Sequence, residues 1–236
     1  MTPKVKALRT QAAGIQELFD TKVLALDWNE TATGKKPDRE DVQKEAKKHG
    51  LTAKHTASLQ GWYTAAVGDV PQEFGVIISQ RSNLYWDADL RRKFARAIKT
   101  VLWVVALGLL GYGIKEHMQL LDFLARFVAP LASTYFVGYR QWVEHTEAAD
   151  RLEKLKEATE KIWAEAIKGA DAKTFKQKCR ALQDQIYDHR KKSPPVFDFI
   201  FKWLKKDSEH ITGKVAAELV AEVKARPAST LCGLSR

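Results

Sequence analysis

AIKTVLWVVALGLLGYGI, residues 97–114, and MQLLDFLARFVAPLASTYFVGY, residues 118–139, decide the fold predicted for this chain. The two segments are 18 and 22 residues long, and only three polar residues separate them. A membrane-spanning helix needs about 20 mostly apolar residues, with a range of about 17–25. The segments therefore predict two membrane-spanning helices joined by a tight turn, a transmembrane hairpin over residues 97–140.

The residues that flank this predicted hairpin fit the two edges of a bilayer. Trp103 lies near the start of the first segment, and Tyr135, Tyr139 and Trp142 lie near the end of the second. Tryptophan and tyrosine are amphipathic rings that favour the headgroup level. Basic residues are concentrated just before the first segment, at positions 91, 92, 93, 96 and 99, whereas the turn carries a single lysine. By the positive-inside rule, both chain ends are expected in the cytoplasm.

Two charged residues, Asp122 and Arg126, interrupt the second segment. A charge at the centre of a bilayer costs roughly 2.5–3.5 kcal/mol on insertion scales. Their four-residue spacing puts both on one helix face, where they can pair and where they would face a bundle interior or a water-filled cavity. We therefore expect an intramembrane or pore-facing pair, followed by a kink at Pro130. The alternative is a soluble hairpin buried in a helical core, with the two charges as an ordinary ion pair near its surface.

The residues on either side of the hairpin predict further helices. In residues 4–24, apolar positions recur at three- and four-residue spacing, which is typical of an amphipathic helix. Residues 51–78 contain several glycines and a proline and are expected to be irregular or to form short helices, and the next helix is expected to start at Ser82 or Asn83. The other expected helices span 38–50, 141–168, 172–190 and 196–225.

The predicted fold class is all-α, a cytoplasmic helical module interrupted by the transmembrane hairpin. Its parts are residues 1–96, 97–140 and 141–236, and the last is expected to pack with the first. Over 236 residues, 39 basic residues against 29 acidic ones give a net charge of +10. This charge favours an anionic partner, such as nucleic acid, a nucleotide or a phospholipid surface. The two cysteines, Cys179 and Cys232, cannot form a disulfide framework, and a reducing cytosol suits them.

Catalytic and metal-binding motifs are absent from the sequence. It contains no phosphate-binding loop, no GxGxxG, no GxSxG and no HExxH spacing among its six histidines. No CxxC pair or Cys/His cluster predicts a zinc site. We therefore expect a protein that is not an enzyme and that has no catalytic residues, no metal and no cofactor.

Three stretches combine aromatic, acidic and basic residues more densely than a scaffold requires. They are LFDTKVLALDWNE (18–30), ISQRSNLYWDADLRRKF (78–94) and LQDQIYDHRKKSPPVFD (182–198). Aromatic rings and guanidinium groups offer stacking planes and forked donors to a phosphate-bearing base. The candidate contacts for such a ligand are Arg81, Trp86, Arg91, His189 and Arg190. The structural alternative is that these residues cap, pair and pack, as Asp87 would with Arg91 four positions later.

In these stretches the chain resembles the four-transmembrane pore-forming effectors that accompany SMODS-type nucleotidyltransferases in bacterial antiphage operons. The resemblance is carried by LFDTKVLALDWN, SQRSNLYWDADLRRKF and LQDQIYDHRKKSPPVFD, and it extends over nearly the whole chain. In that family the nucleotidyltransferase makes a cyclic nucleotide, and the membrane effector responds by permeabilising the inner membrane. The resemblance implies a non-enzymatic effector whose partners are a cyclic nucleotide second messenger, the lipid bilayer and further copies of itself, with a functional link to a nucleotidyltransferase.

The N-terminal part differs from that family pattern. Its members usually carry a further pair of membrane helices ahead of the FDTKV stretch, whereas 18 residues precede Phe19 here. The chain is therefore expected to contribute one hairpin as a multi-pass protein of the bacterial inner membrane, and to line a pore by oligomerising with Asp122 and Arg126 turned inward. Two alternatives stay open: a soluble, basic, all-helical interaction or nucleic-acid-binding protein, and a membrane adaptor that conducts nothing.

Overall fold

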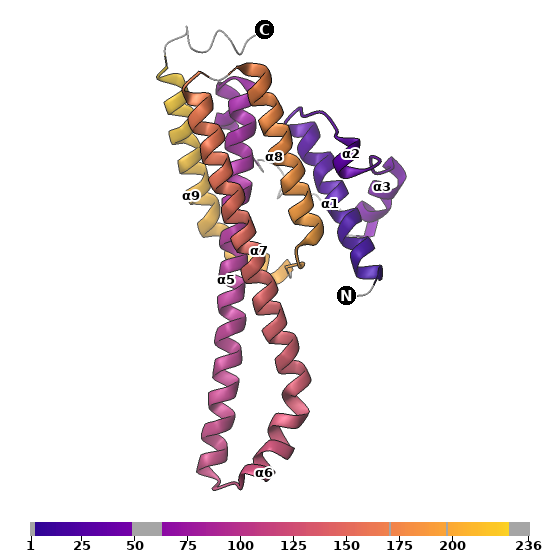
Figure 1. Ribbon diagram of the computed structural model, residues 1–236, viewed down its shortest axis with the longest axis vertical. Coiled ribbons are helices and arrows are strands. Elements are labelled where there is room, and N and C mark those ends of the chain that lie inside the picture. The colour runs from indigo at the N-terminus through magenta and orange to yellow at the C-terminus, as the bar shows by residue number, and fades with distance from the viewer. Residues whose placement is uncertain (1–2, 49–62, 170, 197, 227–236) are drawn as a thin grey trace.

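The computed structural model describes residues 3–48, 63–169, 171–196 and 198–226, and side chains from 198 to 210 are not part of this description. Cys232 and the C-terminal residues 227–236 lie outside the described residues. The described residues form helices and no strand, so the all-α prediction is confirmed (Figure 1). In chain order the elements are α1 (Pro3–Val23), α2 (Glu30–Thr33), α3 (Arg39–Lys48), the 3₁₀ helix η1 (Ala65–Asp69), α5 (Gln72–Lys115), α6 (Leu120–Phe123), the π-helical turn η2 (Leu124–Val128), α7 (Ala129–Ile167), α8 (Ala172–Lys192) and α9 (Asp198–Lys224).

Four helices form a bundle at one end of the molecule. The first half of α5 packs against α7, α8 and α9, as the upper part of Figure 1 shows. On α8, Phe175, Leu182 and Ile186 recur at helical spacing and are buried. Phe74 of α5 meets the rings of Trp163 and Phe175 edge-on, with centroids 5.7 and 5.3 Å apart. Burial of this cluster holds the bundle together, because each large apolar side chain removed from water contributes about 1.5–3 kcal/mol.

Helix α1 packs along α8, and the short α2 follows it there. The predicted amphipathic helix over residues 4–24 therefore forms. Its buried face is unusual because it contains Glu17, Asp20 and Thr21 as well as Ala13. Carboxylates are almost never fully buried without partners, so this face must meet complementary groups on α8.

The hairpin extends from the bundle, and both of its limbs are largely exposed within the described part of the chain. Helix α5 runs unbroken from the bundle into one limb, and α7 returns along the other (Figure 1). Both limbs are long and apolar enough to cross a membrane, yet only 6% and 0% of their most apolar windows are buried. Trp103 and Phe136, for example, are 57% and 64% exposed. The hairpin is thus not buried in the core of this chain's own bundle.

Two glycines let the limbs of the hairpin approach closely. A Cβ atom on Gly113 would lie 2.8 Å from the ring of Phe123, and one on Gly138 would lie 2.9 Å from Leu102. Eleven residues separate Leu102 from Gly113 on α5, whereas fifteen separate Phe123 from Gly138 on the other limb. At 1.5 Å per residue, the second limb is longer by about one turn. It bows away from α5 between the two contacts, as Figure 1 shows.

The bowed limb contains the irregularity expected near Pro130. Residues Leu124–Val128 form a π-helical turn in which the Ala129 N–H donates to the Leu124 carbonyl. Proline has no N–H, and its ring collides with the carbonyl four residues earlier. A wider turn just before Pro130 relieves that collision, and such turns are a common cause of helix bending.

The start of α5 was predicted wrongly. The glycine and proline content of residues 51–78 indicated irregular structure, with a helix from Ser82 or Asn83, but α5 begins at Gln72. Gly75 lies inside the helix because a Cβ atom there would come within 2.9 Å of the Val67 carbonyl oxygen of η1. The glycine that suggested a break instead permits a close packing contact.

Candidate ligand-binding site

The three stretches that combine aromatic, acidic and basic residues are far apart in sequence but lie together in the fold. The first covers the end of α1, the second lies on α5 and the third on α8 with the linker that follows it. Their polar side chains build two connected features, a buried hydrogen-bonded network and a cavity beside it.

Gln183 of α8 lies at the centre of the buried network. Its Nε2 donates to Glu17 Oε2 at 2.8 Å and to Asp20 Oδ2 at 3.1 Å, both on α1. Its Oε1 accepts from Gln80 Nε2 of α5 at 3.0 Å. Gln183, Gln80 and Glu17 are 0–1% exposed. Buried carboxylates and amides are stable only with such partners, so this glutamine fixes α1, α5 and α8 relative to one another.

Two arginines of α8 supply the positive charge that the buried carboxylates need. Arg190 Nη1 donates to Asp20 Oδ2 at 2.7 Å, and Arg180 Nη2 donates to Glu17 Oε1 at 2.7 Å. Burial alone would lower the pKa of Arg190, but the charge of Asp20 outweighs burial and raises it. The Tyr63 hydroxyl donates to Asp20 Oδ1 at 2.8 Å, and burial raises the pKa of Tyr63 well above its ordinary value. Arg190 therefore stays charged and Tyr63 stays neutral near neutral pH.

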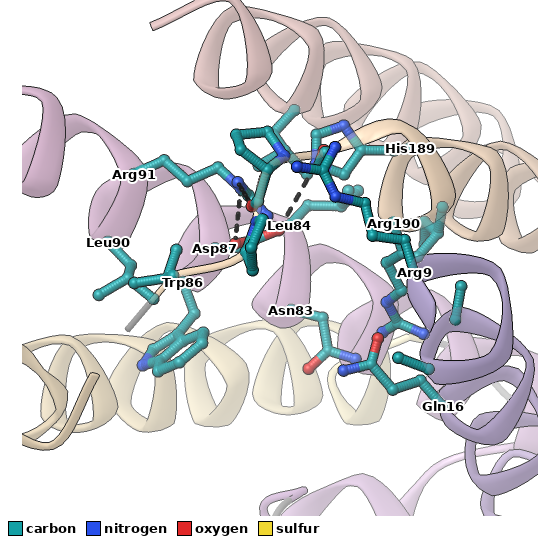
Figure 2. Close-up of a pocket in the computed structure, with 18 residues that line it drawn as sticks. Arg9, Gln16, Asn83, Leu84, Trp86, Asp87, Leu90, Arg91, His189 and Arg190 are labelled. Carbon is teal, nitrogen blue, oxygen red and sulfur yellow. Dashed lines mark hydrogen bonds and ion pairs between the residues drawn. The ribbon is translucent and has the colours of Figure 1, made fainter. Parts of the chain in front are cut away.

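A cavity of about 340 Å³ adjoins this network, and Arg190 belongs to both (Figure 2). Its walls come from α1, α5, α7, α8 and the α8–α9 linker. Three arginines and a histidine line it, against a single carboxylate, Asp87. The polar and aromatic lining residues are Arg9, Gln16, Asn83, Trp86, Asp87, Arg91, His189, Arg190 and Ser193. The lining of this cavity therefore carries more basic than acidic side chains.

Asp87 neutralises part of that positive charge. Its Oδ1 lies 2.9 Å from Arg91 Nε, and its Oδ2 lies 3.5 Å from His189 Nε2. Burial would raise the pKa of Asp87, but the charges and hydrogen bonds of Arg91 and His189 outweigh it and lower the pKa to about 2. The carboxylate is therefore ionised near neutral pH, and it occupies the donors that an anionic ligand would use (Figure 2).

His189 is a buried imidazole with an unused ring nitrogen. Its Nε2 lies 2.9 Å from Ser193 Oγ, while Nδ1 is buried and has no hydrogen-bond partner in the described part of the chain. Burial lowers the pKa of His189, and Asp87 opposes that effect. A buried nitrogen without a partner costs free energy unless a ligand or water satisfies it. His189 also lines a neighbouring cavity of about 430 Å³, whose other walls include Arg151, Lys154 and Lys192.

Arg91 joins the cavity to the α8–α9 linker. Its Nη1 donates to the Pro194 carbonyl at 3.0 Å. Pro194 and Pro195 close that side of the cavity, since both line it. Only eight residues of α5, about 12 Å of helix, separate Arg91 from Lys99, whose ammonium lies 5.3 Å from the ring centroid of Trp142 at the base of the hairpin.

The structure brings together four of the five predicted ligand contacts. Trp86, Arg91, His189 and Arg190 all line the cavity. Arg81 does not, because its Nε pairs with Glu160 Oε1 of α7 at 2.6 Å. In sequence, Arg81 lies ten residues before Arg91, so the two lie in different turns of α5 and on different parts of the helix surface.

Sequence reasoning missed the contribution of α1. Arg9 and Gln16 line the cavity seven residues apart, on one face of α1. Asp87 was predicted only as the ion-pair partner of Arg91, and Asn83 only as a possible start of the helix; neither was predicted to line the cavity. The signal for Asp87 was present, because a carboxylate four residues before an arginine already indicates a charge-compensated site.

His145 lies between the cavity and the hairpin. Its imidazole is 0% exposed, both ring nitrogens lack hydrogen-bond partners in the described residues, and the ring packs edge-on against Phe94 at 4.6 Å. Burial, reinforced by the charge of Arg91, lowers the pKa of His145 to about 4. The ring is therefore neutral near pH 7 and acts as an apolar packing element.

Asp122 and Arg126 are both exposed on the second limb of the hairpin. Within the described residues, neither side chain makes an ion pair or a hydrogen bond. The predicted intramembrane pair is therefore not formed within this single chain.

The side chains that line the cavity offer hydrogen-bond donors and positive charge, chiefly from arginine. No group of three or more His, Cys, Asp or Glu side chains that could hold a metal occurs among the described residues. Cys179 is buried, and burial raises its pKa to about 12, so its thiol is not a nucleophile near neutral pH. Cys179 thus contributes no reactive group near neutral pH.

Comparison with known proteins agrees with the resemblance in the three stretches. The family model described as SMODS-associating 4TM effector domain matches residues 1–219. A protein of Bacillus cereus (strain VD146), described as a probable CBASS effector molecule, is 23% identical over 199 residues. That alignment covers 84% of this chain, and the chain spans 65% of the length of that relative. No solved structure matches the chain.

Proposed function

The chain belongs to the SMODS-associating 4TM effector family, and from this membership we propose that it is a membrane effector of a bacterial antiphage system that responds to a cyclic nucleotide. The relative described as a probable CBASS effector molecule supports this role. In this proposal the chain catalyses nothing and binds a messenger made by a partner nucleotidyltransferase. The bound messenger then changes the arrangement of the membrane hairpin.

The observation that carries the proposal is the cavity on α5. Arg9, Arg91 and Arg190 converge there with Trp86 and His189. Guanidinium groups bind phosphate by paired hydrogen bonds, and an indole ring offers a stacking surface for a base. The arginine excess and the unsatisfied Nδ1 of His189 both favour a phosphate-bearing ligand.

The size of the cavity also fits a small nucleotide. Ligand pockets usually measure about 300–1,000 Å³, and the cavity of about 340 Å³ is at the lower end of that range. The neighbouring cavity of about 430 Å³ shares His189 and is lined by three further cations and two carboxylates, Asp184 and Asp188. A cyclic nucleotide with two or three phosphates would use both, with the His189 imidazole between them.

Ligand binding in the cavity would reach the membrane through α5. Arg91 is held by Asp87 and by the Pro194 carbonyl of the α8–α9 linker. A phosphate that binds Arg91 competes with both partners and frees the linker. Because α5 is one continuous helix from Gln72 to Lys115, a shift at Arg91 moves the hairpin limb. The ligand shifts the equilibrium only by as much as it prefers one arrangement over the other.

We place the hairpin of residues 97–140 across the bacterial inner membrane, with both chain ends in the cytoplasm. Lys99 and Trp142 at its base have the cation and the aromatic ring expected at a cytoplasmic interface. One hairpin does not enclose a channel, so several copies would be needed to form a pore that permeabilises the membrane.

The test is release of a trapped dye from liposomes that contain the full chain, with and without a panel of cyclic nucleotides. One nucleotide is expected to increase release at least tenfold. Trp86→Leu and Arg91→Lys should weaken binding of that nucleotide at least tenfold, whereas Arg81→Ala, which removes a pair outside the cavity, should leave it within twofold. Binding without dye release would favour a membrane adaptor, and release that ignores every nucleotide would contradict the proposal.

A further inference from the structure

Asp122 and Arg126 present an uncompensated charge pair on an otherwise apolar surface. Both are exposed, and neither contacts an oppositely charged group in the described part of the chain. Their surroundings on the same limb are exposed apolar side chains, including Leu121 at 79% and Leu124 at 41%. Charged side chains among lipid-facing residues are costly and are rarely left without a partner.

The two residues lie on one face of the limb. Four α-helical positions advance the chain by slightly more than one turn, and the wider π-helical turn at Leu124–Val128 leaves them on the same side. Contacts to α5 place them near the polar turn: Phe123 packs on Gly113, and the rings of Tyr112 and Phe127 are 5.7 Å apart.

The depths of the two charges can be matched between neighbouring copies. Along the helix axis Arg126 lies about 6 Å deeper than Asp122. Side chains on a helix lean toward its N-terminus, which for this limb is the end at the polar turn. The Arg126 guanidinium therefore reaches toward the level of Asp122. Copies inserted in the same orientation hold their Asp122 carboxylates at that same level.

We infer that this face is the contact surface for a second copy of the chain, and that Arg126 of each copy pairs with Asp122 of the other. A face that carries both members of a charge pair is complementary to itself across a two-fold axis. The inference rests on the membrane placement proposed above, and it adds the partner of the hairpin and the residues that recognise it.

Charge reversal separates pairing between chains from pairing within one chain. Differently tagged full-length copies are co-expressed, extracted in mild detergent, and scored for co-purification without nucleotide. Asp122→Arg leaves two arginines on the face and Arg126→Asp leaves two aspartates, so each variant should lose self-association at least fivefold. Mixing the two variants should restore it, since every arginine then meets an aspartate across the contact. The doubly reversed variant, Asp122→Arg with Arg126→Asp, should self-associate like wild type.

The control variant is Glu116→Arg, a charge reversal in the exposed turn, which should not change co-purification. If reversal disturbs insertion, Asp122→Asn and Arg126→Gln give the same test with neutral side chains. Each variant alone should lose at least threefold in self-association, and mixing the two should restore part of it, because one Arg126–Asp122 pair remains across the contact. Restoration in the double variant without restoration in the mixture would show a pair within one chain and overturn the inference. So would equal co-purification of all variants, or none in wild type. Because no nucleotide or dye release enters this assay, its failure leaves the proposed signalling function standing.

Discussion

Asp20 of α1 and Arg190 of α8, 170 residues apart in the chain, form a buried ion pair with Oδ2 and Nη1 2.7 Å apart. The pair connects the stretch of residues 18–30 with that of residues 182–198. Tyr63 and Gln183 donate further hydrogen bonds to Asp20. It therefore holds α1 onto the bundle and fixes one wall of the cavity, because Arg190 belongs to both.

Removing one partner of this pair should destabilise the protein strongly. Asp20→Asn leaves the buried Arg190 charge without compensation, and losing one member of a buried pair typically costs about 3–5 kcal/mol. Thermal unfolding of the full chain in detergent, followed by tryptophan fluorescence, measures the loss. Asp38→Asn is the matched control, since its pair with Lys35 is largely exposed and should contribute less than about 1 kcal/mol. Equal melting of the two variants would contradict the structural role of Asp20.

Removing the cavity carboxylate should strengthen anion binding. Asp87 occupies Arg91 and His189, so Asp87→Asn frees both for a phosphate. The affinity for inorganic phosphate, or for the nucleotide that triggers dye release, should rise roughly tenfold, about 1.4 kcal/mol. Isothermal titration calorimetry measures it.

Asp89→Asn serves as the control for this change because Asp89 is two residues away and pairs with Lys93 at 2.7 Å. Its affinity should match that of the wild type. Weaker binding in Asp87→Asn would show that the carboxylate holds the arginine in place for the ligand and does not compete with it.

Much of the fold followed from hydrophobic spacing alone. The amphipathic pattern of residues 4–24 and the apolar segments at 97–114 and 118–139 all gave helices where they were expected. The start of α5 did not follow, because the reason for Gly75 is a carbonyl of η1 that approaches it in space. The sequence alone does not distinguish a glycine that permits close packing from a glycine that ends a helix.

The cavity was only partly predictable for a similar reason. Mixed aromatic and charged stretches indicated Trp86, Arg91, His189 and Arg190, because such combinations rarely serve packing alone. Arg81 belongs to the same stretch as Arg91 but pairs on another side of α5. Arg9 lies on a helix whose pattern is that of an ordinary amphipathic surface. Which residues of a stretch share a cavity depends on helix rotation and on packing partners that only the three-dimensional fold supplies.

His145 should make the protein sensitive to mild acid. Burial lowers its pKa to about 4, against an ordinary value of 6.5. Between these values the unfolded chain binds a proton that the folded chain does not. The stability contributed by the neutral ring is complete above pH 6.5 and is lost as the pH falls toward 4, a change on the order of 3 kcal/mol. Melting temperatures measured from pH 7.5 to 4.5 should show this decline.

The variant His145→Leu should reduce that pH dependence, because leucine fills the same apolar space and does not titrate. Part of the dependence should remain, because burial also lowers the pKa of His189. His117→Asn is the control, since His117 lies in the exposed polar turn and should leave the acid sensitivity as in wild type. Asp87 titrates at still lower pH, near 2, and therefore does not contribute to this window. An unchanged slope in His145→Leu would assign the acid sensitivity to another group.

The close packing of the hairpin limbs should depend on Gly113 and not on Gly108. A methyl group on Gly113 would come within 2.8 Å of the Phe123 ring, whereas nothing lies within 4 Å of the corresponding position on Gly108. Gly113→Ala must displace the ring or spread the limbs, at a cost of about 1–3 kcal/mol. Gly108→Ala should be neutral or stabilising by up to about 1 kcal/mol, since alanine favours helix over glycine. Unfolding in mixed micelles that contain an increasing fraction of denaturing detergent compares the stability of the two variants. If Gly113→Ala resists unfolding as well as Gly108→Ala does, the limbs do not pack through this contact.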